Sequence, residues 1–221
     1  MSKQETYRWK RCVALTILIP VFILLASVAF AGWTALIPPP VSSDWALSKI
    51  AFSSRTEAWA VGEDVSNGSG VLLRYSGGAW AAISPPNVSS GWGLSDVHFP
   101  ASGEGWAVGR DSMGARGVLL HFLSGTWGSV TTPPVSPEWS LSGVHFPSPS
   151  SGWAVGTDDY YGKGVILQIL EGVVTTLTPP TISSDWGLEK VFFPAVGDGW
   201  AVGKDRANSR GVLLRYADGL W

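Results

Sequence analysis

Gly105-Trp106-Ala107-Val108-Gly109 decides the fold, because its last four residues occur four times along the chain at a constant spacing. The copies of Trp-Ala-Val-Gly begin 47 residues apart, at Trp59, Trp106, Trp153 and Trp200. Three further columns keep this period without insertion or deletion: the glycines Gly70, Gly117, Gly164 and Gly211, the tryptophans Trp45, Trp92, Trp139 and Trp186, and the tryptophans Trp80, Trp127 and Trp221, with Val174 in the third place. A fixed period of this length is the signature of a repeat fold.

Each repeat contains four short segments in which apolar residues alternate with polar ones. In the second repeat these segments are residues 94–99, 105–109, 117–122 and 127–131, and Gly, Pro, Ser or Asp residues separate them. Alternation of period two between such residues predicts β-strands, and no segment between them has the 3.6-residue period of a helix. Four strands in a repeat of about 40–50 residues are typical of a β-propeller blade. The sequence therefore predicts an all-β propeller of four repeats.

The start of the repeat region predicts how this propeller closes. Residues 33–40 copy the pattern of residues 80–87, which form the last strand of the first repeat, and the chain ends at Trp221, where the corresponding strand of the fourth repeat would begin. We expect the strand at 33–40 to pair with the last blade, because a closed ring leaves no open sheet edge. Two alternatives remain open: an eight-bladed ring shared by two chains, or a piece of a larger propeller.

The composition fits a packed core and argues against nucleic-acid binding. The chain of 221 residues has 45% hydrophobic and 14% charged residues, and its 13 Trp outnumber its 8 Phe and 5 Tyr. This apolar content excludes intrinsic disorder. Residues 32–221 hold 11 Lys and Arg against 16 Asp and Glu, so they carry no basic footprint for nucleic acid.

Residues 1–31 have the pattern of an export signal. Four basic residues precede an apolar run that starts at Cys12, and Ala29-Phe30-Ala31 is a small-residue cleavage site. The alternative is an uncleaved signal anchor, because residues 12–31 are long enough to span a bilayer. Either arrangement places the propeller domain, residues 32–221, outside the cytoplasm, in the periplasm or secreted. This domain lacks cysteine, so packing alone must hold it together.

Motifs of the second repeat resemble those of the photosystem II assembly/stability factor family and, more broadly, of Asp-box (sialidase-type, BNR) propellers. The resemblance rests on residues 97–100, 105–109, 117–120 and 124–127 and extends over all four repeats, residues 33–221. The Asp-box hairpin has decayed: residues 75–80, 123–127 and 217–221 keep its Gly and Trp, and among them only Asp218 keeps the acid. The resemblance implies a propeller that scaffolds assembly or binds a partner.

The tryptophan columns predict one candidate binding site. The column of Trp59 lies within strands among apolar neighbours and is predicted to be core, and the column of Trp80 is predicted to close the last hairpin. The remaining column follows polar, Pro-rich links, where an exposed ring can stack on a sugar or on a partner's side chain; its members are Trp45, Trp92, Trp139 and Trp186. The alternative is that these rings wedge between neighbouring blades.

An aspartate column is the weakest candidate site. Asp64, Asp111, Asp158 and Asp205 each follow Trp-Ala-Val-Gly by two residues. A ring of carboxylates could attract a hard cation, whereas the alternative is that each Asp accepts hydrogen bonds from its own turn. His98, His121 and His145 exchange with other residue types between repeats, so we expect them on solvent-facing strand positions.

The sequence favours a protein that is not an enzyme. It contains no metal-ligand spacing, cofactor motif or nucleophile elbow, and its scattered acids single out no pair for a glycosidase. The leading hypothesis is an exported scaffold that binds a protein partner. The alternatives are a lectin-like propeller that uses the column of Trp45 to bind a glycan and, less favoured, a glycosidase-type enzyme.

Overall fold

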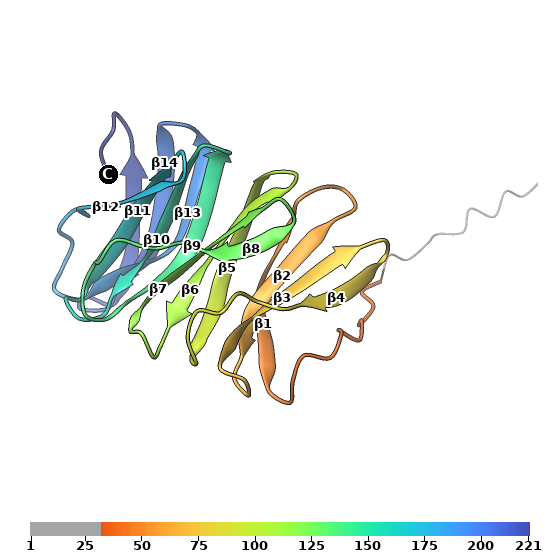
Figure 1. Cartoon of the computed structure of the whole chain (residues 1–221). Helices are drawn as coiled ribbons and strands as arrows, with labels where there is room; N and C mark the ends of the chain where they lie inside the picture. Colours follow the sequence, from red (N-terminus) through yellow and green to blue (C-terminus); the bar gives the residue numbers. More distant parts are fainter. Residues whose placement is uncertain (1–31) are drawn as a thin grey trace, which may run out of the picture. The chain divides into compact units, whose positions relative to one another are not determined.

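The computed structural model describes residues 32–221, and the predicted leader, residues 1–31, lies outside them (Figure 1). The repeat unit extends from Ile37 to Trp221 and consists of β-strands joined by turns and loops. Within residues 32–221, no helix is long and apolar enough to cross a membrane.

Each repeat forms its own antiparallel sheet, in which consecutive strands are neighbours. The first sheet contains β1 (Trp45–Phe52), β2 (Ala58–Asp64), β3 (Ser69–Ser76) and β4 (Ala79–Ile83). The second contains β5 (Trp92–Ala101), β6 (Glu104–Asp111), β7 (Arg116–Leu123) and β8 (Thr126–Ser129). The third contains β9 (Trp139–Ser148), β10 (Ser151–Asp158), β11 (Lys163–Leu170) and β12 (Val173–Leu177). The fourth contains β13 (Trp186–Ala195), β14 (Asp198–Asp205) and β15 (Arg210–Tyr216).

The predicted four strands per repeat are confirmed in three repeats, with corrected bounds. The first strand of the second repeat begins at Trp92 and not at residue 94, because Trp92 is paired with Asp111 at the far end of β6. The last strand ends at Ser129 and not at residue 131. Pairing between strands therefore extends to residues whose own sequence context is that of a loop.

A bulge in the first strand explains the glycine of every Trp-Ala-Val-Gly. The register between β5 and β6 shifts between Leu94 and Asp96, opposite Gly109. A Cβ atom on Gly109 would lie 1.9 Å from the carbonyl oxygen of Gly93. The other repeats show the same geometry. A Cβ atom added to the equivalent glycine would lie 1.9–2.0 Å from the carbonyl oxygen of the equivalent first-strand residue, at Gly62, Gly156 and Gly203. Only glycine lets the two backbones approach this closely at the bulge.

The core lies between consecutive sheets, which pack face to face in chain order. Each sheet has two faces. We call the face that carries Trp and Val of the second strand, such as Trp106 and Val108, the trailing face. We call the opposite face, which carries the apolar residues of the first strand, the leading face. On the trailing face of the second sheet, Trp106 stacks on Phe146 of the leading face of the third, with ring centroids 4.9 Å apart. The column of Trp59 is therefore core in the first three repeats, as predicted.

The closing strand expected at residues 33–40 is not formed. Residues 32–44 belong to no strand, and the fourth sheet has three strands. The physical reason is visible in Figure 1: the sheets form an open row, in which β1 lies at one end and β15 at the other. Residues 37–44 lead directly into the first sheet, at the opposite end of this row from the three-stranded fourth sheet.

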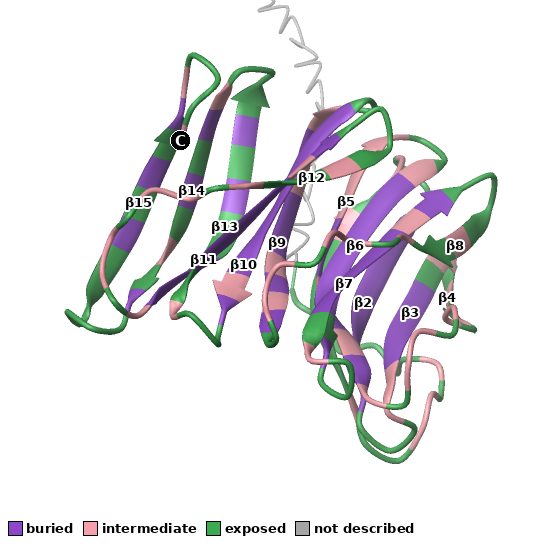
Figure 2. Ribbon diagram, turned by 60° about the vertical axis from the view of Figure 1, so that its left-hand side comes forward, coloured by how far each residue is buried: buried purple, intermediate pink, exposed green. Residues whose placement is uncertain are grey.

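Burial follows this arrangement. In the third sheet, β10 and β11 are buried over most of their length, whereas β14 and β15 of the fourth sheet alternate between buried and exposed residues (Figure 2). An alternating pattern means that one face of the fourth sheet packs against the third while its other face is open to solvent.

Candidate functional site

The candidate column Trp45, Trp92, Trp139 and Trp186 begins the first strand of each sheet and is not in the preceding loop. Trp92, Trp139 and Trp186 are buried, and Trp45 is partly buried. Each buried ring lies on a glycine of the preceding sheet: a Cβ atom on Gly117 would be 2.4 Å from the ring of Trp139.

This packing corrects the expectation of an exposed aromatic platform for three of the four rings. They wedge between neighbouring sheets, which is the alternative that the sequence left open. Pairing with the aspartate column draws the tryptophans into the strand, because Trp139 lies opposite Asp158 in the register of β9 and β10. Glycan binding by this column stays a prediction without support from the positions of its rings.

The aspartates of this column accept hydrogen bonds from their own turns, which is the alternative that the sequence left open. Asp111 accepts hydrogen bonds from the backbone N–H of Gly114 and from the hydroxyl of Ser89, both at 2.7 Å. The serine belongs to the link before the repeat, so the aspartate also fastens that link. Hydrogen bonds from Ser183 and then Asn208 lower the pKa of Asp205 to about 2.

Each of these carboxylates serves its own sheet, and they do not gather into one site. Asp64, Asp111, Asp158 and Asp205 are all buried. In the part of the chain that the structure describes, no group of three or more His, Cys, Asp and Glu side chains could hold a metal ion. Asp158 differs from the others, because its Oδ2 is buried without a hydrogen-bond partner within residues 32–221.

His98 and His145 are not on solvent-facing positions, which corrects the sequence expectation for these two histidines. Nδ1 of His98 accepts a hydrogen bond from the backbone N–H of Phe146, and Nδ1 of His145 accepts one from that of Phe193, both at 3.3 Å. Burial, followed by the neighbouring His145, lowers the pKa of His98 from 6.5 to about 4. His98 is therefore neutral at pH 7 and joins the first strands of two consecutive sheets.

A charged cluster beside these histidines was missed by sequence reasoning. Asp96 is 4% exposed and accepts a hydrogen bond from Nζ of Lys190 at 3.0 Å, while Nζ of Lys49 lies 3.7 Å from its other oxygen. These residues and Gly143 occupy the same position in the four repeats. Gly143 packs closely on the backbone of Lys190, where a Cβ atom would be 3.0 Å from the Cα atom.

The cluster joins the first, second and fourth repeats through one buried carboxylate. Asp96 also accepts backbone N–H groups from Val97 at 3.0 Å and Val144 at 3.4 Å, so the third repeat takes part as well. The signal in the sequence was one repeat position that holds two lysines, an aspartate and a glycine, that is, charges of opposite sign at equivalent places in the repeats.

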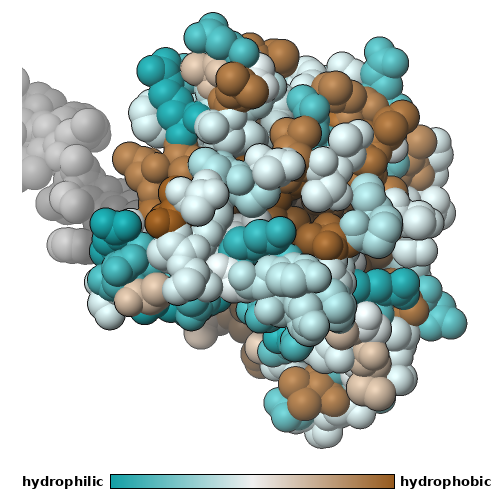
Figure 3. Space-filling model, turned by 90° about the vertical axis from the view of Figure 1, so that its left-hand side faces the viewer, coloured by the Kyte–Doolittle hydropathy of each residue, from teal (hydrophilic) through white to brown (hydrophobic). Residues whose placement is uncertain are grey.

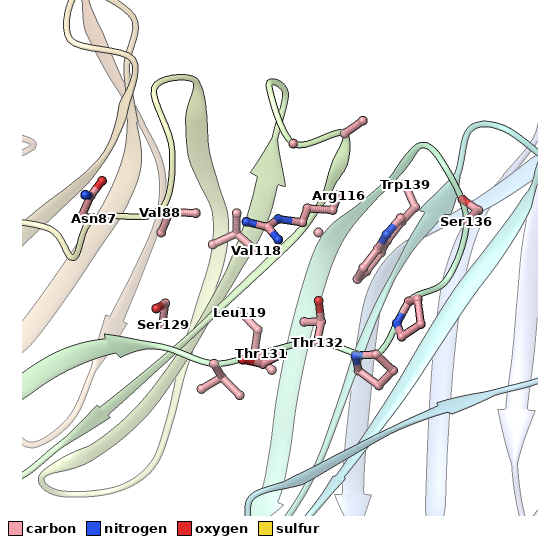
Figure 4. Close-up of a pocket in the computed structure, with 16 residues that line it drawn as sticks. Asn87, Val88, Arg116, Val118, Leu119, Ser129, Thr131, Thr132, Ser136 and Trp139 are labelled. Carbon is pink, nitrogen blue, oxygen red and sulfur yellow. The ribbon is translucent and has the colours of Figure 1, made fainter.

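A groove of about 420 Å³ lies between the second and third sheets. Its lining includes Asn87, Arg116, Thr131, Thr132 and Trp139, and Figure 4 shows the guanidinium of Arg116 within the space between the two links. Nε of Arg116 donates a hydrogen bond to Asp111 at 3.3 Å. Within residues 32–221 this is the only hydrogen bond of that side chain.

A smaller groove of about 250 Å³ occupies the equivalent place in the first repeat. There Ser69 stands in the position of Arg116, and Pro85 in that of Thr132. The two grooves share a backbone frame and differ in side chains: this position is Ser69 in the first repeat and basic in the other three, as Arg116, Lys163 and Arg210. Sequence reasoning missed this site because its residues vary between repeats.

The arrangement of the sheets defines the structural class of the protein. Four-stranded antiparallel meanders that pack face to face in chain order are blades of the β-propeller class. Among solved structures, YCF48 from Cyanidioschyzon merolae is similar, with 17% sequence identity and a TM-score of 0.53 over 80% of this chain and 52% of that chain. The chain thus spans about half the length of that YCF48 chain.

The resemblance to photosystem II assembly/stability factor repeats is thereby confirmed at the level of the fold. A second solved structure, of YCF48 bound to D1 peptide, has 13% identity and a TM-score of 0.32 over 82% of this chain and 99% of that chain. No protein-family model matches the chain. The comparison with curated proteins also finds no match.

Proposed function

We propose that this protein is a non-enzymatic scaffold that binds a protein partner, and that the groove between the second and third sheets holds an extended segment of that partner. The observation that carries this proposal is the guanidinium of Arg116, which lies in the groove with a single hydrogen bond to its own chain within residues 32–221. The similarity in fold to YCF48, together with the resemblance to assembly-factor repeats, supports a protein as the ligand.

The chemistry of Arg116 favours a carboxylate on the bound segment. A guanidinium has five N–H donors, and the Nε–H of Arg116 faces Asp111. The terminal nitrogens remain for a ligand, and a carboxylate can accept two parallel hydrogen bonds from such a fork. Asp111 is fully buried and holds the arginine from behind, so the side chain enters the groove with restricted freedom.

The walls of the groove fit an extended peptide. Thr131 and Thr132 carry hydroxyls that donate and accept hydrogen bonds, and Asn87 adds an amide on the opposite link. Pro133 and Pro134 continue the link as a stiff apolar wall. Polar groups at fixed places beside rigid apolar surface are the usual composition of a binding site.

We further propose that the scaffold works outside the cytoplasm, in the periplasm or as a secreted protein. The support is the basic start, apolar run and Ala29-Phe30-Ala31 cleavage site of residues 1–31. Alkaline phosphatase fused after Trp221 is active only when exported, which checks this part. Loss of that activity on changing three of the leader's apolar residues to Asp is the expected result.

The partner proposal is tested by crosslinking in the fraction where the protein resides. A photoreactive residue at Thr132 is expected to capture one partner in stoichiometric amount, and Arg116→Ala should reduce that yield at least tenfold. Arg74→Ala is the control, because Arg74 is likewise a part-exposed arginine that pairs with a carboxylate of its own sheet, Glu57, and lies outside the groove. Equal capture by Arg116→Ala would show that the groove does not bind the partner, and turnover of a substrate would refute a purely scaffolding role.

A further inference from the structure

The two ends of the row expose sheet faces that all internal sheets bury. On the leading face of the first sheet, Leu47, Ile50 and Phe52 are 45%, 49% and 61% exposed. Their equivalents in the third and fourth sheets are at most 7% exposed. These apolar residues are open because, within residues 32–221, no sheet packs on the leading face of the first one.

The trailing face of the fourth sheet, at the other end of the row, also exposes apolar side chains. Trp200, Val202 and Leu213 are 40%, 43% and 66% exposed, whereas their equivalents in the first three sheets are at most 2% exposed. Figure 3 looks onto this end of the molecule and shows hydrophobic side chains at its surface. An apolar face that is buried at every internal position of a repeat array indicates an interaction site where it is left open.

A pair of residues that meets at all three internal junctions is separated at the ends. At these junctions the ring of Trp92, Trp139 or Trp186 lies against Gly70, Gly117 or Gly164, where a Cβ atom would be 2.4–2.5 Å from the ring. A Cβ atom on Gly211 would meet no atom within 4 Å, and Trp45 is only partly buried. The glycine cradle at one end and the tryptophan at the other are the two halves of a fourth junction.

The charges near the two ends also complement each other. At the junction of the second and third sheets, Arg110 and Glu138 form an ion pair with a distance of 2.9 Å. By the 47-residue period, Lys204 takes the place of Arg110 and Asp44 takes the place of Glu138 at a fourth junction. Lys204 lies on the fourth sheet and Asp44 directly precedes β1, so a fourth junction brings opposite charges together.

We infer that the trailing face of the fourth sheet binds the leading face of the first sheet in a second copy of this chain, with Trp45 of one copy on Gly211 of the other. A contact between two different faces generates either a closed ring or an open filament, depending on the rotation at each contact. Two copies supply eight sheets, a number within the usual range of four to eight blades in a closed propeller. The result is a two-fold symmetric ring of eight sheets.

This interface is independent of the proposed peptide groove. The groove lies at the junction of the second and third sheets and contains none of Leu47, Phe52, Trp200 or Gly211. A dimer therefore presents two grooves, and failure of either proposal leaves the other standing.

The test is the mass of the purified full-length chain in a non-ionic detergent, by sedimentation velocity with the detergent accounted for. The wild type is expected to be a dimer. Gly211→Leu should shift it to monomer, with a dissociation constant raised about 10- to 100-fold, because the added side chain fills the cradle of Trp45. Gly128→Leu is the matched control: Gly128 is also an exposed strand glycine, a Cβ atom there meets nothing within 4 Å, and it lies away from both end faces.

Charge exchange provides a second variant that leaves the apolar faces intact. Asp44→Lys should weaken the dimer, and adding Lys204→Glu should restore it. A monomeric wild type would overturn the inference and favour closure by the chain itself or by another partner. An open filament, or a dimer that survives both Gly211→Leu and Trp45→Ala, would overturn it as well, because assembly would then use another surface.

Discussion

Replacing Asp96 by alanine tests the central cluster most directly, because one buried carboxylate holds groups from all four repeats. Asp96 accepts the backbone N–H groups of Val97 and Val144 and the ammonium of Lys190. Each buried N–H left without an acceptor costs about 1 kcal/mol. The bond to Lys190 adds about 1 kcal/mol, a value reduced because that side chain is 50% exposed. The expected loss for Asp96→Ala is therefore about 3 kcal/mol.

Lys190→Ala separates the carboxylate from its cation. In that variant Asp96 keeps both backbone donors, and Lys49 remains 3.7 Å away. The Lys190 side chain is 50% exposed, so water already screens its interaction with Asp96, and the expected loss is only about 0.5–1 kcal/mol. The ratio of the two losses distinguishes a carboxylate that organises the backbone of the first strands from one that only forms an ion pair.

Urea unfolding followed by tryptophan fluorescence measures both losses, provided that the slope against urea is unchanged. For a chain of this size, about 3 kcal/mol corresponds to a fall in melting temperature of roughly 6–12 °C. Equal losses for Asp96→Ala and Lys190→Ala, or a loss below about 0.5 kcal/mol for Asp96→Ala, would refute the reasoning. Either result would mean that the backbone N–H groups find other acceptors.

Further substitutions test the roles of the bulge glycine, of His98 and of the aspartate column in the stability of the fold. Gly109→Ala should cost at least about 3 kcal/mol in urea unfolding, because its Cβ atom meets a backbone oxygen at 1.9 Å, whereas Gly128→Ala meets nothing and should be nearly neutral. The pKa of His98 is lowered to about 4, so the unfolded chain binds more protons below its ordinary pKa of 6.5. Stability should accordingly be full above pH 6.5 and fall by about 2 kcal/mol as the pH drops to 4, a loss that His98→Gln should largely remove in a pH series of urea midpoints. Asp111→Ala should cost about 2–3 kcal/mol and Asp158→Ala about 1 kcal/mol, because the first accepts three hydrogen bonds and the second one within residues 32–221; similar losses in thermal melts would contradict the difference in their partners.

The candidate site illustrates where residue patterns mislead. The column of Trp92 follows a Pro-rich link, which is the context of an exposed loop residue, but strand pairing opposite Asp111 draws the ring between two sheets. His98 exchanges with alanine and phenylalanine between repeats, which is typical of a solvent-facing position. In the structure it accepts a backbone hydrogen bond from the next sheet, and such a contact leaves no trace in local periodicity.

The groove could not be predicted from the sequence for a related reason. A repeat is recognised by what its copies share, whereas the position of Arg116 is occupied by Ser69, Lys163 and Arg210 in the other repeats. Asp111 is only five residues from Arg116, but the groove also needs Trp139 of the third sheet, which comes beside Arg116 only when the two sheets pack. Sites built on positions that differ between repeats therefore require the structure.

The sequence by itself determined the number of repeats, their strands and the tryptophans and glycines that build each sheet. These features depend on alternation between residues i and i+2 and on turn residues at fixed offsets, and both are local. Tertiary structure alone decided that residues 33–40 form no closing strand and that Trp45 and Gly211 stand at opposite ends of the row. The curvature of a row of sheets is the sum of small rotations at each junction. Those rotations depend on how side chains of successive repeats interlock, which the spacing of residues along one chain does not record.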